Sequence, residues 1–381
     1  MKLSLKHSLI FILILLSGKA EAATFGMNDV SMLLPLPAPQ GIAGMLSPVD
    51  AGAKGQLLPK DIYLRFPALD NRFDAQTLYD NNFKVIGIRI DPCFAEGTST
   101  VCRKQIRLVW QPLAAFKDGT ITLDAAVHSF YEFSDAEWVT LLKKWARISK
   151  GNMTEGLLIN PTLKQEGYAG PTWTALKKIV LESCGDKNLV RVTGMRLSAM
   201  RMWTFMGFDR ISQQWTAMTI PRTSSTQESF VLVPEGLFDL NAFQGTLSPT
   251  PQGEDLLLGL VTESREFRLK RSESDAKTLM THMIQFENPT MHDPGTVDCV
   301  SCHMAQVVRI WGEHNYSSWN WKTEFESNRF SLKDENLENN SVNPFSTNRV
   351  RAFGYFDADP ILSQRVINET GLVVERLKAM P

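Results

Sequence analysis

Two segments of alternating hydrophobicity constrain the fold of this chain more than any other feature. Isoleucine recurs at every second position from 86 to 90 within residues 83–90, and Ile106, Leu108 and Trp110 alternate with other residues within residues 104–111. A period of two places successive side chains on opposite faces of a β-strand, so both segments predict strands with one buried face. Because they follow one another along the chain, we expect them to form an antiparallel hairpin.

Two cysteines lie in the connection between these predicted strands. Cys93 and Cys102 are separated by eight residues, one of which is Gly97. In an oxidising compartment such a pair is expected to form a disulfide that fixes the ends of the hairpin. A metal or redox role is the alternative, but neither the spacing nor a nearby histidine favours it.

The following segments extend the sheet and add helices. Residues 125–133 predict a third strand, and residues 188–220 predict an antiparallel meander. Ser134 and Glu137 have the spacing of a capping box, which predicts a helix start, and Pro171 suits the first turn of a second helix. These elements predict an α+β fold built mainly on antiparallel strands with packed helices.

Two reactive side chains within these elements receive no functional role from the sequence. His128 lies in the third predicted strand, where a lone histidine is more often a surface or core residue than a ligand. Cys184 falls on the apolar face of the second predicted helix, so we expect a buried thiol that packs as a small hydrophobic group.

The first residues of the chain predict export. Lys2 and Lys6 precede an apolar run at residues 9–16 that is too short to span a membrane, and Ala20 and Ala22 match a signal-peptidase site. We therefore expect cleavage after Ala22, a periplasmic or secreted mature protein, and no membrane insertion after cleavage.

The sequence also predicts how the chain is divided. The expected parts are a signal peptide (residues 1–22), an extended Pro/Gly-rich arm (23–59), a β-rich α+β domain (60–270) and a smaller helical, loop-rich C-terminal part (271–381). The 40 basic and 41 acidic residues nearly balance. The chain therefore has no electrostatic signature of a nucleic-acid-binding protein or of one that binds an anionic membrane surface.

The C-terminal part contains the motif with the clearest chemistry. Cys299, Cys302 and His303 form the pattern C-x-x-C-H. Two thiols about one helical turn apart can add to the two vinyl groups of a porphyrin, and the next histidine can then ligate the iron. Over these five residues the chain resembles the haem-attachment segment of c-type cytochromes. The resemblance implies one covalently bound haem c, with His303 as metal ligand, electron transfer, and a redox partner protein that remains unknown.

The ligand on the other side of the iron is not fixed by the sequence. Small cytochromes of this type usually supply a methionine beside a proline well downstream, followed by a final helix. Met380 precedes Pro381, but the chain ends there. The other candidates are His292, His314, His282, a further methionine, or no residue at all, which would leave a position open for a small molecule.

Two other classes of function remain open from the sequence. In one, the chain is an exported, non-catalytic structural or binding protein, and Cys299 and Cys302 form a disulfide or, with His292 or His303, a zinc site. In the other, Cys299 and Cys302 form a thiol–disulfide redox module, although its usual strand-then-helix context is missing. The sequence contains no other recognisable catalytic constellation, so it leaves open whether the protein is an enzyme.

Overall fold

The computed structural model describes most of the chain between residue 24 and residue 380. The described residues are 24–67, 69, 73–95, 102–117, 119–151, 156–197, 202–221, 226, 228–232, 243–244, 264–316, 318–321 and 350–380. The predicted signal peptide, residues 1–22, lies outside the described residues.

A large antiparallel sheet forms the centre of the molecule. Its strands run in the order β1-β4-β5-β7-β8-β9-β11-β12, with β6 paired to β5 and β10 paired to β9. The strands are β1 (Ser31–Leu33), β4 (Phe83–Phe94), β5 (Arg103–Phe116), β6 (Gly119–Thr122), β7 (Ala125–Phe133), β8 (Leu189–Leu197), β9 (Met202–Ile211), β10 (Gln214–Ala217), β11 (Glu228–Leu232) and β12 (Phe243–Gln244). The α+β fold is therefore confirmed, as are the predicted hairpin, the third strand and the meander.

Alternation along these strands produces two chemically different faces. In β5, Ile106, Leu108 and Trp110 are fully buried in the main hydrophobic core. Arg107 points to the opposite face, as does His128 of β7, and both line a cavity there. The period of two that buries one set of side chains thus directs the other set towards the C-terminal helices.

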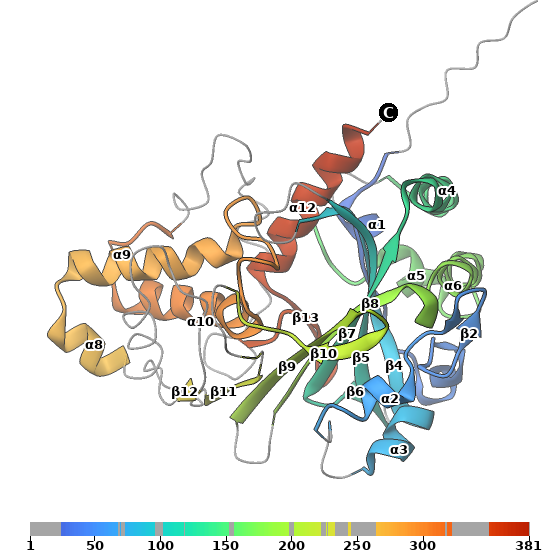
Figure 1. The fold of residues 1–381 in the computed structure, drawn as a ribbon, viewed down its shortest axis with the longest axis horizontal. Coiled ribbons are helices and arrows are strands. Elements are labelled where there is room, and N and C mark those ends of the chain that lie inside the picture. Colours follow the sequence, from blue (N-terminus) through green and yellow to red (C-terminus); the bar gives the residue numbers. More distant parts are fainter. Residues whose placement is uncertain are drawn as a thin grey trace, which may run out of the picture.

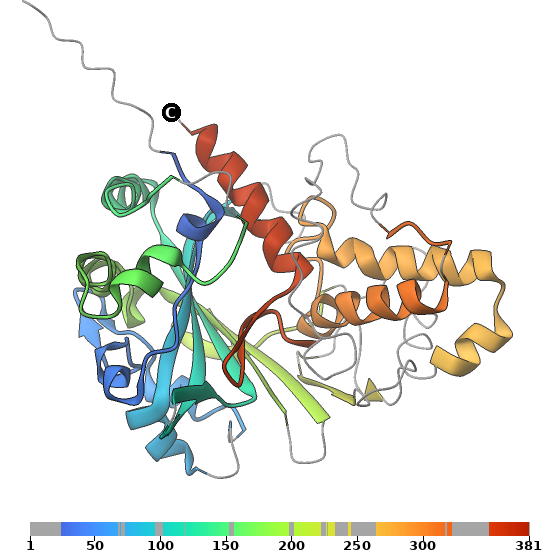
Figure 2. The same cartoon turned by 180° about the vertical axis from the view of Figure 1, so that it is seen from behind.

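Helices cover both faces of the sheet. Figures 1 and 2 show α4 (Asp135–Trp145), α5 (Pro161–Glu166) and α6 (Pro171–Ser183) on one side, and α9 (Glu273–Ile284), α10 (Cys299–Asn315) and α12 (Gln364–Lys378) on the other. The Ser134–Glu137 capping box at the start of α4 is confirmed. Cys184 directly follows α6 and is fully buried without a disulfide, as predicted.

The N-terminal residues form short elements packed against the sheet. Residues 33, 34, 46, 57 and 58 are leucines that are completely buried in the main core. Strand β1 occupies the edge of the sheet beside β4. The short elements are α1 (Met27–Val30), η1 (Pro39–Gly44), β2 (Ala51–Gly52), β3 (Gly55–Gln56), α2 (Lys60–Tyr63), α3 (Ala75–Thr77) and η2 (Leu78–Asn82). One further short segment, η3 (Asp186–Asn188), follows α6.

The C-terminal residues return to the sheet. Besides α9, α10 and α12, they form α8 (Ser264–Lys270), η4 (Gln285–Glu287), β13 (Phe353–Phe356) and β14 (Asp359–Leu362). One hydrophobic cluster joins α9 and α10 to Met195, Trp203 and Phe205 of the sheet. Val366 and Ile367 of α12 belong to the main core instead. Helix α12 therefore covers the β4 side of the sheet, beside α10, which packs on β9 and β11 (Figures 1 and 2).

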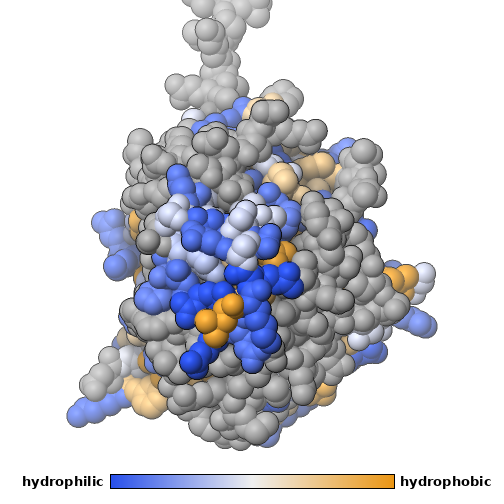
Figure 3. Space-filling model, turned by 90° about the vertical axis from the view of Figure 1, so that its left-hand side faces the viewer, coloured by the Kyte–Doolittle hydropathy of each residue, from blue (hydrophilic) through white to orange (hydrophobic). Residues whose placement is uncertain are grey.

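The exposed end of the molecule around α8 and α9 is mainly hydrophilic where its residues are described (Figure 3). Leu269 of α8 is 73% exposed, but basic residues flank it on either side. Within the described part of the chain, none of the helices has the length and apolar character needed to cross a membrane.

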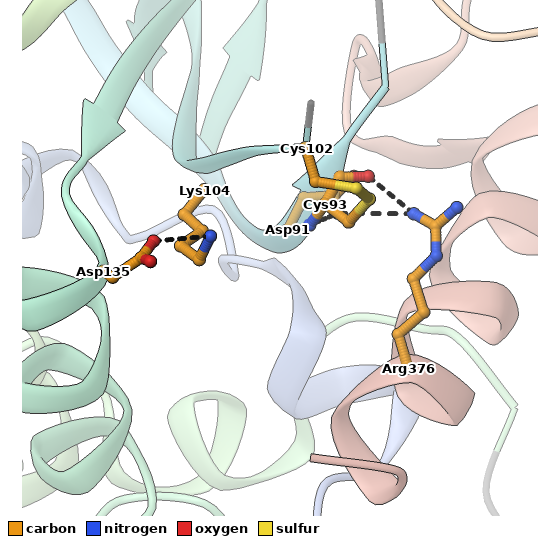
Figure 4. The surroundings of a disulfide bond; sticks show 6 residues. All are labelled: Asp91, Cys93, Cys102, Lys104, Asp135 and Arg376. Carbon is orange, nitrogen blue, oxygen red and sulfur yellow. Dashed lines mark hydrogen bonds and ion pairs between the residues drawn. A yellow bond between two sulfur atoms is a disulfide. The ribbon is translucent and has the colours of Figure 1, made fainter. Parts of the chain in front are cut away.

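The predicted disulfide between Cys93 and Cys102 is confirmed. It joins the ends of β4 and β5 (Figure 4), and the Cα atoms of the two cysteines lie 4.3 Å apart. Arg376 of α12 donates a hydrogen bond of 2.7 Å to the carbonyl oxygen of Cys93 and lies 3.7 Å from the carboxylate of Asp91. The disulfide thus closes the end of the hairpin, and Arg376 attaches this end to the last helix.

We expect the double variant Cys93→Ser, Cys102→Ser to lose about 2–3 kcal/mol of unfolding free energy, because a loop of this length restricts the unfolded chain by about that amount. Urea denaturation of the purified protein measures the change. Wild-type protein treated with a reductant should lose a similar amount. A loss of less than about 0.5 kcal/mol would contradict the stabilising role of the bond.

Candidate functional site

The first turn of α10 positions the C-x-x-C-H residues. Asp298 caps this helix, and its carboxylate accepts a hydrogen bond of 3.1 Å from the backbone N–H of Ser301. The helix begins at Cys299, so Cys302 lies almost one turn later on the same side and His303 follows it. The aspartate cap is a sequence signal for this helix start.

A backbone carbonyl fixes the imidazole of His303. Its Nδ1 atom lies 2.5 Å from the carbonyl oxygen of Val350. Because a carbonyl oxygen can only accept, Nδ1 carries the hydrogen and donates it. Burial lowers the pKa of His303, which favours the neutral ring. The neutral ring then presents Nε2 as its ligating nitrogen, the arrangement typical of metal-binding histidines.

Both motif cysteines and His303 line one cavity of about 120 Å³ between the sheet, α10 and α12. The wall formed by the α10 region includes Pro294, Val297, Asp298, Cys299, Cys302 and His303. The wall formed by the sheet and the loop next to it includes Arg89, Phe94, Arg107, His128, Phe130, Arg191, Thr193 and Met218. Ala352, Arg365, Val366 and Glu369 complete it. The cavity thus combines two thiols, two imidazoles and four guanidinium groups.

Pairing between strands creates the charged wall of this cavity. Arg89 of β4 pairs with Arg107 of β5, Arg107 pairs with Phe130 of β7, and Phe130 pairs with Arg191 of β8. Four residues from four strands therefore form one row across the sheet. At the end of this row Arg191 forms a bidentate ion pair with Asp209 of β9. Its Nε and Nη2 atoms donate to the two carboxylate oxygens at 2.6 and 3.0 Å.

His128 is a second imidazole at the cavity, and the sequence assigned it no role. It lies in the next row of the sheet, where it pairs with Val109 and Thr193. Burial, followed by the nearby charges of Arg107 and then His303, lowers the pKa of His128 well below its ordinary value. The neutral imidazole is the form that binds metals. The alternation of buried residues along β7 shows which face of the sheet His128 occupies. The cavity, however, is formed by segments that lie far apart in the sequence, so the sequence pattern does not reveal it.

The histidines and the methionine named as candidates for the second iron ligand lie elsewhere. His292 has its ring 4.5 Å from that of Phe286, and His314 is exposed in the last turn of α10. His282 is in the last turn of α9. Met380 follows α12 and packs against the main core. As the described residues define the cavity, none of these four lines it, whereas His128 and Met218 do.

The environment of the two motif cysteines keeps their thiols protonated. Neither is disulfide-bonded in the structure. Burial is the main cause that raises the pKa of Cys299 to about 12 and that of Cys302 to about 11, and the Asp298 carboxylate adds to both. Reactive redox cysteines usually have a lowered pKa, because the thiolate is the nucleophile. The surroundings of Cys299 and Cys302 favour the protonated thiol instead.

Among the residues that the structure describes, no group of three or more His, Cys, Asp or Glu side chains is arranged to hold a metal ion. A zinc site at Cys299 and Cys302 would need such a group.

Comparisons of the chain with protein-family models, with curated proteins and with solved structures found no match.

Proposed function

We propose that this protein is an exported electron-transfer protein with one c-type haem, linked through thioethers to Cys299 and Cys302 and ligated by His303. The observation that carries the proposal is that both thiols and an imidazole with a fixed tautomer line the same cavity. Attachment through two thioethers requires two thiols about one turn apart, and ligation requires a neutral histidine beside them.

The side chains that line the cavity suit a haem, but the enclosed volume is too small to hold a whole one. The cavity of about 120 Å³ is smaller than a porphyrin, so the macrocycle would extend beyond its enclosed part. Phe94, Phe130 and Val297 supply apolar contacts for a ring, and the arginines supply cationic contacts at its edge. The group would contribute a one-electron redox couple, while the protein would set its potential through axial ligation, hydrogen bonding and burial.

In this proposal, the residues around His303 orient its ring and set the properties of the iron. The Val350 carbonyl accepts from Nδ1, which holds the ring orientation and makes Nε2 more basic. Phe205 packs beside the ring, with the two centroids 5.1 Å apart. On the sheet wall, His128 and Met218 are the cavity residues that would offer an imidazole or a thioether to the iron. Ligation by His128 would give a lower potential than ligation by Met218.

The two alternatives have less support. A thiol–disulfide redox module would need an activated thiolate, whereas burial raises the pKa of Cys299 and Cys302. A zinc site would need further ligands close to the two thiols, and the described residues do not supply such a set. The thiol–disulfide alternative also gives no reason for His303 to donate from Nδ1 and present Nε2.

We expect His303→Ala to change the spin state of the haem iron, because the substitution removes its strong-field axial nitrogen. Electron paramagnetic resonance and absorption spectra of the exported protein measure this change. His314→Ala is the matched control, since it removes a histidine from the exposed end of the same helix. Identical spectra for wild type and His303→Ala would exclude His303 as the ligand.

A further inference from the structure

A buried cluster of charges lies at one side of the cavity. Glu369 of α12 lies 3.3 Å from a guanidinium nitrogen of Arg107 and 3.7 Å from one of Arg89. It lies 3.4 Å from Arg365, one turn earlier on α12. The side chains of Arg89 and Arg365 are 7% exposed, and those of Arg107 and Glu369 are 12% exposed. Three arginines therefore share one carboxylate in a poorly hydrated place.

The cluster carries an excess of positive charge. Burial alone would raise the pKa of Glu369, but Arg89, Arg107 and Arg365 outweigh it and hold the pKa well below its ordinary value. With Glu369 ionised, three positive charges face one negative charge among the residues that the structure describes. Asp91 lies nearby, but it faces Arg376 at 3.7 Å, so that pair leaves the excess unchanged. Charges buried without partners are strongly unfavourable, so this arrangement calls for an anion.

Neutral contacts hold the arginines in place without neutralising them. Arg89 donates from Nε to the hydroxyl of Ser31 at 3.0 Å, and Arg365 donates to the carbonyl oxygens of Phe286 and His292 at 3.1 and 2.8 Å. Arg107 lies over the rings of Phe94 and Phe130. Its buried Nε atom has no hydrogen-bond partner within the part of the chain that the structure describes.

We infer that Arg89, Arg107 and Arg365 form a binding site for carboxylate groups, and that these carboxylates are the propionates of the haem. Planar guanidinium groups bind carboxylates through paired hydrogen bonds, and a haem brings two carboxylates, which matches the charge excess. All three arginines line the cavity that contains Cys299 and Cys302. The assignment to propionates rests on the proposed function, whereas the site for carboxylates rests on the arginine cluster alone.

The first test is the reduction potential of the purified haem protein. We expect Arg107→Gln to lower the potential, because loss of a nearby positive charge favours the oxidised iron. Arg107→Lys should retain most of the wild-type potential, because it keeps the charge. Arg103→Gln is the control: it removes an arginine from the same strand, four residues away, whose side chain is 41% exposed. An equal potential in wild type and Arg107→Gln would overturn the propionate assignment.

The second test distinguishes the two sources of the carboxylate. Melting temperatures are measured with acetate added at constant ionic strength. Propionates bound by the arginines would leave the wild-type melting temperature independent of acetate. A rise in wild type that disappears in Arg107→Gln, with no change in potential, would support a free carboxylate ligand and overturn the propionate assignment. If neither the potential nor the acetate response depends on Arg107, the site itself is overturned.

The same acetate experiment separates this inference from the proposed function. If the exported protein carries no haem, the proposed function fails. The acetate dependence of the melting temperature is then compared between the haem-free wild-type and Arg107→Gln proteins. Stabilisation of the wild type alone by acetate would then support the carboxylate site. No difference between the two proteins would overturn it.

Discussion

The double variant Cys299→Ala, Cys302→Ala is expected to leave the exported protein without any covalently bound haem. Both thiols line the same cavity from one turn of α10, so together they supply both thioether links of the proposed site. Each single variant should keep one link. Haem staining of a denaturing gel, together with intact mass, measures the number of links. Retention of covalent haem in the double variant would show that attachment occurs elsewhere.

A matched control is available within the chain. Cys184 is buried after α6 and lies in the main core with the sheet, not at the cavity. Cys184→Ala removes a thiol of the same chemistry, so it should keep the full amount of covalent haem. A loss of haem in this variant would indicate that the effect of the double variant reflects general misfolding.

We expect Arg309→Met to lower the free energy of unfolding by about 3–5 kcal/mol at neutral pH, because it breaks a buried ion pair and leaves one charge behind. Arg309 donates from Nε to a carboxylate oxygen of Glu287 at 2.9 Å, and their side chains are 2% and 0% exposed. The guanidinium also lies 4.6 Å from the ring of Trp321. Denaturation with urea measures the loss.

The pH dependence of this loss follows from the state of Glu287. Burial raises the pKa of Glu287, and Arg309 partly offsets that increase. Without Arg309 the pKa rises further, so the folded variant keeps a proton that the unfolded chain releases above about pH 4.3. The folded state then binds more protons, and the variant loses stability relative to wild type as the pH rises. The deficit should therefore be smaller near about pH 4 than near about pH 7.

A second substitution tests this explanation. Glu287→Gln added to Arg309→Met removes the carboxylate and should remove most of the pH dependence of the deficit. A deficit in Arg309→Met that is independent of pH would contradict the account, because packing losses alone do not change with proton binding.

Local patterns in the sequence were sufficient for much of the fold. Alternation predicted β4, β5 and β7, and the spacing of two cysteines predicted the Cys93–Cys102 bond. The capping box predicted the start of α4. These features depend on residues close together in the chain, where periodicity and hydrogen bonding act directly. By contrast, Pro360 would suit the first turn of a helix, but it lies in β14, and α12 begins only after its cap at Ser363.

The composition of the candidate site could be predicted only in part. The sequence identified Cys299, Cys302 and His303, which lie within a five-residue segment of one helix. It did not identify His128 or Arg107, because each is a single polar residue in a strand. Their proximity to the motif depends on the pairing of four strands and on the packing of α12, which contributes Glu369 from 262 residues beyond Arg107. Long-range packing of this kind leaves no local pattern in the sequence.

The most direct test of the central proposal is the intact mass and absorption spectrum of the mature protein, purified after export from a host that attaches haem to cytochromes. The proposal predicts a coloured protein whose mass exceeds that of the processed chain by one haem, with Cys299 and Cys302 both modified. A colourless protein with unmodified Cys299 and Cys302 would contradict it.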